Sequence, residues 1–410
     1  MQHKLTLLLL VLIVILPGTA TRSAQDSGDH PLLRMLALIP DVPSVRENNG
    51  IPVAYLDRHA VETKRAGAAQ PHSWAEWRAL SDTHDPSFAL WMAAFDSVAA
   101  GPDWIGQILL NGAEDMVDAV GFDYFDITRA LSYGQPPAVT DILEGDFDIS
   151  AVGIALSNRE FTETDRNGIA LWCGLAGCEN GLDIDFAAIN MANPFGGRLG
   201  RTQPLVVLPG YLVSSPVYDR IEDTFNVLTG AQSSLADAPD FRAAADAIIR
   251  TGTLLQALFL DPNTAFDSPP PDNADPLLVY SLAAVAQVVN DPDELTLIAL
   301  VFDDVSQAQA AAGLVEQRLS AYESLVDGRL FTEVLEERGL VSRDVAVYFS
   351  EAAGKSVLII TFRKSLPTDG LQQDESGLER YEPSGLIFRT LVNALYQRDL
   401  NWLAPAAGLE

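Results

Sequence analysis

Each half of the chain carries the same order of expected elements, a strand, then a helix, then a hairpin, and this repeat restricts the fold more than any other feature. In the first half, GDFDISAVGIALSNREF predicts a strand end and then a helix, because Asp148 is a good N-cap and Val152 and Leu156 share one helical face. Asn167-Gly168 then separates two strand-like runs, and Asn-Gly is the strongest short signal for a hairpin.

The second half repeats this order with stronger signals. LTLIALVF is apolar on both alternating sets of residues, which predicts a central strand covered on both faces. The next segment, DDVSQAQAAAGLVEQRLSAY, spaces its apolar residues three and four apart and predicts an amphipathic helix capped at Asp304. VAVYFSEAAGKSVLIITF then predicts two strands around a turn at Gly354.

Packing these elements in two layers predicts an α+β protein with two similar open α/β-sandwich halves. We expect mainly antiparallel sheets with helices on one face, and the repeat suggests a duplication. The Gly- and Pro-rich stretch NPFGGRLGRTQP, residues 193–204, is interpreted as the turn between two domains, at 32–200 and 204–403. It lacks the Gly-Lys-Ser/Thr ending of a phosphate-binding loop. A last amphipathic helix is expected at 386–396.

Residues 1–20 have the order of a secretory signal peptide. Lys4 precedes an apolar run of 12 residues, Leu5 to Leu16, which Pro17 and small residues follow. A run of that length is shorter than the roughly 20 residues that span a bilayer. We therefore expect a secreted or extracytoplasmic protein of the cell envelope, with a flexible lead-in at 21–31 and no membrane span in the mature chain. An uncleaved membrane anchor is the alternative.

The only two cysteines, Cys173 and Cys178, are predicted to form a structural disulfide. Outside the cytoplasm such a pair is oxidised by default, and the two glycines of the intervening GLAG permit a tight turn. A redox motif normally has two intervening residues and opens a helix. Zinc needs about four ligands, and no second Cys or His pair lies nearby. The disulfide should close the exit of the second strand of the predicted hairpin.

The net charge of the chain argues against nucleic acids and anionic membranes as partners. The chain has 26 Lys+Arg against 56 Asp+Glu, a formal net charge of −30. Nucleic acid is not an expected partner, because phosphate binding needs clustered basic residues. Anionic membrane surfaces are disfavoured for the same reason.

The positions of the histidines give little support for a catalytic or metal-binding role. All five histidines lie in the first fifth of the chain: His3, His30, His59, His72 and His84. No Gly-x-Ser-x-Gly motif is present, and a Ser-His-Asp arrangement that ends in histidine is hard to build. The group Asp82, His84 and Asp85 matches no helical metal site and is interpreted as a solvated loop. No catalytic residue, metal site or cofactor is predicted.

Two sets of paired acids remain as carboxylate candidates, since residues two apart on an extended chain share a face. They are Glu144, Asp146 and Asp148 in EGDFD, and Asp183 and Asp185 in LDIDF. Glycosidases use two such groups, but 56 acids produce such pairs by number alone. We therefore expect an exported non-enzymatic protein that binds an envelope protein, peptide, glycan or lipid. The alternative is a carboxylate-dependent hydrolase acting on polysaccharide.

Trp74 and Trp77 share one helical face and are the candidates for stacking on a bound sugar or peptide. Packing in the core is the default interpretation for both rings, because tryptophans are usually mostly buried.

Three segments resemble a known group of proteins. LEGDFDISAVGIALSNREF with its hairpin, SSLADAPDFRAAADAI, and GFDYFDITRALSYGQPP look like their counterparts in exported and lipoprotein-like bacterial proteins of the DUF3352 class. The resemblance implies an extracytoplasmic protein and no assigned chemistry. The chain departs from the lipoprotein members of the group because no cysteine follows its apolar run.

Overall fold

The structure is a computed structural model and describes residues 30–46, 53–65, 70–83, 85–96, 98–105, 113–266, 277–366, 371–373, 379–381 and 384–405. The predicted signal peptide at 1–20 lies outside these residues, as does the predicted lead-in except for its last two positions. No helix in the described part of the chain is long and apolar enough to cross a membrane.

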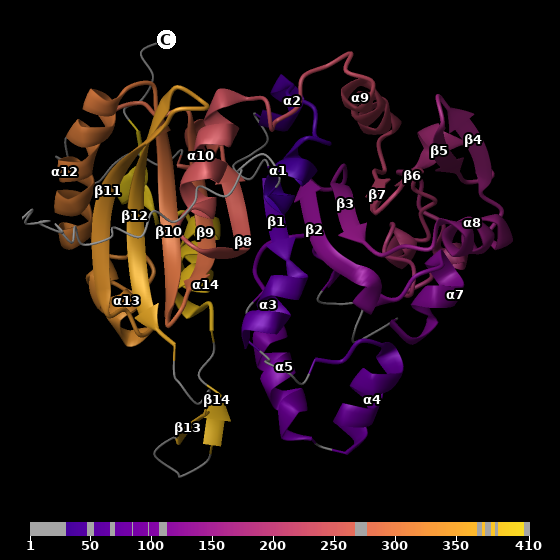
Figure 1. Cartoon of the computed structure of the whole chain (residues 1–410), viewed down its shortest axis with the longest axis horizontal. Helices are drawn as coiled ribbons and strands as arrows, with labels where there is room; N and C mark the ends of the chain where they lie inside the picture. The colour runs from indigo at the N-terminus through magenta and orange to yellow at the C-terminus, as the bar shows by residue number, and fades with distance from the viewer. Residues whose placement is uncertain are drawn as a thin grey trace, which may run out of the picture.

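One twelve-stranded antiparallel sheet organises the described residues (Figure 1). Its strands, in spatial order, are β11 (Ser342–Ser350), β12 (Lys355–Ser365), β10 (Asp293–Phe302), β9 (Leu282–Asn290), β8 (Thr253–Leu260), β1 (Val53–Asp57), β2 (Ile127–Tyr133), β3 (Thr140–Gly145), β7 (Tyr211–Ser214), β6 (Leu205–Leu208), β5 (Ile169–Cys173) and β4 (Thr162–Arg166). A separate two-stranded sheet pairs β13 (Leu371–Gln373) with β14 (Glu379–Tyr381).

The two halves of the large sheet meet at the antiparallel pair β1–β8, in which Tyr55 lies opposite Ala257. Outward from this pair one half runs β8-β9-β10-β12-β11, and the other runs β1-β2-β3, then β7-β6, then β5-β4. The halves therefore have the same topology, except that the β6–β7 hairpin is inserted between β3 and β5. This order supports the predicted repeat.

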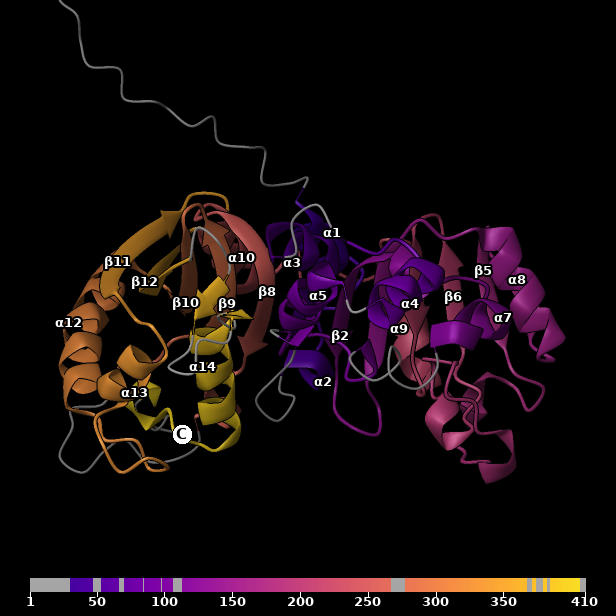
Figure 2. The ribbon, with the colours of Figure 1, turned by 90° about the horizontal axis from the view of Figure 1, so that it is seen from below.

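Helices cover both faces of the sheet (Figure 2). The first face carries α1 (Pro31–Leu36), α9 (Tyr218–Leu228) and α10 (Pro239–Ile249). The other face carries α3 (Arg58–Arg65), α5 (Pro86–Asp96), α7 (Met116–Val120) and α8 (Ile149–Asn158) over the first half, and α12 (Val305–Ala321), α13 (Phe331–Glu337) and α14 (Leu386–Tyr396) over the second. In the part of the chain that the structure describes, the other α-helices are α2 (Pro43–Arg46), α4 (Trp74–Asp82) and α11 (Pro262–Ala265).

The α+β class and the antiparallel sheets are confirmed. The helices were expected on one face, and the structure has them on both because the central strands are apolar on both faces. On β10, Leu297 and Ala299 belong to the core under α10, whereas Ile298 and Leu300 belong to the core under α12 and α14. All four are fully buried, as the sequence of this strand predicted.

Several local predictions are also confirmed. Asp148 caps α8 by accepting from the backbone of Ser150 at 2.9 Å, and Asp304 caps α12 in the same way. Asn167 and Gly168 both have positive φ, 59° and 83°, in the turn between β4 and β5. The last helix, α14, spans the predicted residues 386–396.

The predicted boundary at 200–204 falls between hydrogen-bonded neighbours. β6 and β7 follow it in the chain, yet β6 pairs with β5 and β7 pairs with β3. The segment after the boundary therefore completes the first half of the sheet. Division of the chain into two folding units at this point is still a prediction.

Candidate ligand-binding site

The segment that breaks the repeat is residues 174–214, here called the inserted segment. It contains three short 3-10 turns, η4 (Cys178–Asn180), η5 (Phe186–Ala188) and η6 (Gly197–Leu199), followed by the β6–β7 hairpin. The loops of this segment project from the first half of the sheet, toward the lower right in Figure 2. The second half has no counterpart between β12 and β10, which are direct neighbours.

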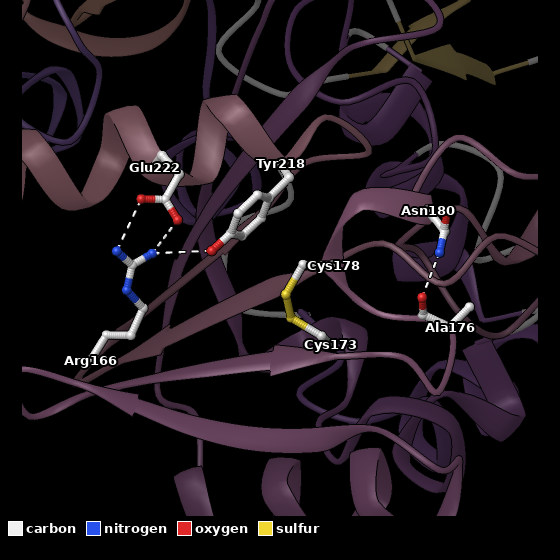
Figure 3. The surroundings of a disulfide bond; sticks show 7 residues. All are labelled: Arg166, Cys173, Ala176, Cys178, Asn180, Tyr218 and Glu222. Atoms are coloured by element: carbon white, nitrogen blue, oxygen red, sulfur yellow. Dashed lines mark hydrogen bonds and ion pairs between the residues drawn. A yellow bond between two sulfur atoms is a disulfide. The ribbon is translucent and has the colours of Figure 1, made fainter.

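A disulfide closes the start of the inserted segment, as predicted. Cys173 ends β5 and Cys178 begins η4, and their Cα atoms are 4.8 Å apart (Figure 3). Asn180 donates a side-chain hydrogen bond to the carbonyl oxygen of Ala176 within the same turn. These contacts hold the chain where it leaves the sheet.

Close backbone packing shapes the far end of the segment. Gly200 has φ +65°, and a Cβ atom there would lie 1.7 Å from the carbonyl oxygen of Asp185. Asn193 is buried, and its side chain both accepts from the backbone nitrogen of Phe195 at 3.1 Å and donates to its carbonyl oxygen at 3.3 Å. The Gly- and Asn-rich sequence therefore produces a fixed loop at this position.

This loop borders a cavity of about 370 Å³. Its apolar wall is formed by Trp104, Met191, Pro194 and Leu199, and the rest of its lining by Asn193, Gly196 and Arg198. Trp104 comes from a segment nearly ninety residues earlier and is 8% exposed. An apolar cavity with a few polar groups is the usual form of a small-molecule site.

A buried carboxyl lies behind the tryptophan wall. The indole nitrogen of Trp104 donates to Oδ2 of Asp141, on β3, at 3.0 Å. Oδ1 of Asp141 is covered and has no hydrogen-bond partner among the described residues. Burial raises the pKa of this carboxyl to about 7, the hydrogen bond from Trp104 opposes the rise, and the charge of Asp103 adds to it. Asp141 is therefore partly protonated at neutral pH.

One arginine borders the cavity and a second lies beside it. Arg198 borders the cavity. Arg201 packs against Gly196, another lining residue: a Cβ atom added at Gly196 would lie 2.8 Å from the Cβ of Arg201. The Nε atom of Arg201 is buried and has no hydrogen-bond partner among the described residues.

The two tryptophans selected from the sequence lie in a different aromatic group. The rings of Trp74 and Trp77 stack on each other with centroids 4.4 Å apart, and Trp77 makes edge contacts with Phe88 and Trp91. Both pack against the core of the first half and are partly buried. A role in ligand stacking remains a prediction for this pair.

The acidic pairs have local structural contacts. Glu144 forms ion pairs with Arg34 at 2.8 Å and Arg129 at 3.3 Å. Asp148 caps α8, and Asp185 caps η5 by accepting from the backbone of Ala187. The described residues contain no group of three or more His, Cys, Asp or Glu side chains arranged to hold a metal.

Histidines take no part in the cavity as the structure describes it. His30 caps α1 through its Nδ1 atom, and burial, with the charges of Arg129 and Arg34, lowers its pKa to about 4. His3 and His84 lie outside the described residues, so the group of Asp82, His84 and Asp85 is not seen as a whole.

Comparison with known proteins adds little to this description. No protein-family model and no curated protein matches the chain. Solved structures to which the chain is similar include crystal form I of TP0453, with 10% identity over 80% of this chain and 93% of that chain, at a TM-score of 0.30. Crystal form IV of TP0453 gives 10% identity over 80% and 95% of the two chains, at a TM-score of 0.31. The DUF3352 resemblance stays a prediction.

No local signal in the sequence marked the cavity. Trp104 and Asp141 are separated by 37 positions in the chain and meet only in the folded protein. The stretch NPFGGRLG drew attention as a turn, but its role as a cavity wall depends on Trp104 packing opposite it.

Proposed function

We propose that the chain is an exported binding protein without a catalytic function, and that the cavity beside the inserted segment holds its ligand. The observation that carries this proposal is the cavity itself, formed where the first half of the sheet departs from the repeat. Its volume of about 370 Å³ lies within the range of small-molecule sites, on the order of 300–1,000 Å³. The disulfide fits a protein that works outside the cytoplasm.

Exposed apolar side chains on the inserted segment further support a binding role. The most exposed are Leu175 at 79% and Phe186 at 74%, and Met191 and Leu199 are exposed at the cavity itself. Concentrated apolar exposure marks interaction sites more often than it does inert surface. A ligand in the cavity would cover part of this apolar surface.

The test compares ligand retention by matched variants purified from the native cell envelope. Leu199→Trp places a larger ring at the cavity edge, and Leu325→Trp makes the same change at an exposed leucine of the second half. Mass spectrometry of the denatured proteins should show a small molecule released from the wild type and from Leu325→Trp, and much less from Leu199→Trp. Equal release from all three would contradict the proposal.

A carboxylate-dependent hydrolase is the second candidate, and one observation favours it. Asp141 has a pKa of about 7, which suits a general acid at neutral pH. A glycosidase also needs a second carboxylate across the bond. No carboxylate is among the residues that border the described cavity. Turnover of a glycoside, ester, phosphate or peptide substrate that one substitution abolishes would favour the hydrolase and overturn the binding proposal.

A further inference from the structure

We propose that the ligand of this cavity is a small organic anion, with an apolar body against Trp104 and Leu199 and a carboxylate, sulfonate or phosphate group facing Arg198. This inference rests on the proposed binding function and names the chemical class of the ligand. The shape of the cavity wall supports the apolar body of the ligand, and the charge of the lining supports its anionic group.

The apolar part follows from the wall of the cavity. Trp104, Met191, Pro194 and Leu199 present an indole ring, a thioether and aliphatic groups. The indole nitrogen of Trp104 already donates to Asp141, so this wall offers the ligand mainly apolar contacts. Burial of an aliphatic or aromatic body here is favourable by the hydrophobic effect.

The anionic part follows from the charge of the lining. Arg198 is the charged side chain that borders the cavity in the described structure. A guanidinium group has five N–H donors in a fixed planar arrangement, so it can bind an anion while it keeps another contact. Asp141 lies behind Trp104 and is not part of the lining, so the formal charge among the residues that border the cavity is that of Arg198.

Arg201 is a second cation near the cavity, beside the lining residue Gly196. This chain has 30 more acidic than basic residues, and its arginines are commonly paired with carboxylates, as Arg129 is with Asp57 and Arg166 with Glu222. Arg201 has no ion pair or side-chain hydrogen bond in the described structure, and its Nε is buried. Leaving a buried donor without an acceptor is costly. Arg201 does not itself border the cavity, so its charge would favour an anion at Arg198 from behind the wall.

Isothermal titration calorimetry with three probes of equal chain length tests the inference. Octanoate, 1-octanol and octylamine share an apolar body and differ in the charge of the head group. We expect the wild-type mature chain to bind octanoate at least about tenfold more tightly than 1-octanol, as a charge-assisted hydrogen bond implies. Octylamine should bind most weakly.

Arginine variants locate the preference. Arg198→Gln with Arg201→Gln should lower the affinity for octanoate to that for 1-octanol. Arg343→Gln, at an exposed position of β11, makes the same change of charge in the other half and should retain the preference. If the double variant does not fold, Arg198→Gln alone, at an exposed position, should still reduce the preference.

Three results would overturn the inference, and they can be told apart. If wild type binds octanoate and 1-octanol equally, and Leu199→Trp abolishes both, the cavity binds ligands but does not prefer anions. If octanoate fails to bind the wild type, the inference fails. If octanoate binds Leu199→Trp as tightly as it binds the wild type, the inference fails and the cavity is also contradicted as the binding site.

Discussion

Trp104 donates its indole hydrogen to Asp141 at 3.0 Å and thereby joins the wall of the cavity to a buried carboxyl on β3. The carboxyl has its pKa raised to about 7, chiefly by burial. The native state therefore keeps a proton that the unfolded chain releases near pH 4. Because the native state binds more protons over this interval, Asp141 makes the protein less stable as the pH rises from about 4 to about 7.

Asp141→Asn should remove this dependence. Asparagine keeps an acceptor for Trp104 and cannot ionise. The free energy of unfolding of the variant, minus that of the wild type, should therefore be greater at pH 8 than at pH 4.5, by roughly 3 kcal/mol. Urea denaturation at the two pH values measures it. Asp183→Asn, which neutralises an exposed acid of the inserted segment, is the control. A pH-independent effect of Asp141→Asn would contradict the assignment.

Arg58 and Glu62 form a buried ion pair on α3, with side chains 6% and 5% exposed. Arg58 also donates to the carbonyl oxygen of Phe125 at 3.0 Å and lies over the ring of Tyr124. Arg58→Met leaves Glu62 buried without its cation and should lower the free energy of unfolding by about 3–5 kcal/mol. Chemical denaturation measures the loss.

The matching controls separate burial from loss of charge. Arg58→Met combined with Glu62→Leu removes both charges and should recover part of the loss. Arg78→Met breaks an exposed pair with Glu114 and should cost at most about 1 kcal/mol. Equal effects of the changes at Arg58 and Arg78 would refute a structural role for the buried pair.

Two glycines of the inserted segment with positive φ differ in their surroundings. Gly177, at φ +96°, has nothing within 4 Å of an added Cβ, whereas Gly200 would place that atom 1.7 Å from the carbonyl oxygen of Asp185. Gly177→Ala should cost about 1 kcal/mol through its backbone conformation. Gly200→Ala should cost about 2 kcal/mol or more and also weaken octanoate binding, because the nearby Gly196, Arg198 and Leu199 border the cavity. Similar stability and binding for the two variants would count against a fixed loop.

Removing the disulfide should have a mainly local effect. Cys173 and Cys178 are five positions apart, so their bond closes a small loop. Cys173→Ser with Cys178→Ser should lower the free energy of unfolding by about 2 kcal/mol and increase amide hydrogen exchange around residues 174–180. Intact mass without reductant should show the wild type lighter than its dithiol form by two hydrogen atoms. Free thiols in freshly exported protein would contradict an oxidised native state.

Local signals in the sequence predicted much of the fold. The Asn167-Gly168 turn, the cap at Asp304 and the apolar pattern of β10 each involve residues close together in the chain. Two features of the fold could not be predicted from such local signals. The pairing of β1 with β8 joins segments about 200 residues apart, and the coverage of both faces depends on where α10 and α14 pack.

The candidate site was beyond prediction for the same reason. Trp104 belongs to no motif in the sequence, and Asp141 is one of 56 acidic residues with no motif around it. What distinguishes Asp141 is its burial behind Trp104, which only the folded chain creates. The Gly-rich stretch at 193–204 was recognised as irregular, but its neighbours across the cavity were not.

The cavity beside the inserted segment is the proposed binding site. Its most direct test is calorimetric titration of octanoate into the wild type, Leu199→Trp and Leu325→Trp. Leu199→Trp should bind octanoate at least about tenfold more weakly than wild type, a loss of about 1.4 kcal/mol in binding free energy, whereas Leu325→Trp should bind as wild type does. Equal binding by Leu199→Trp and wild type would contradict it.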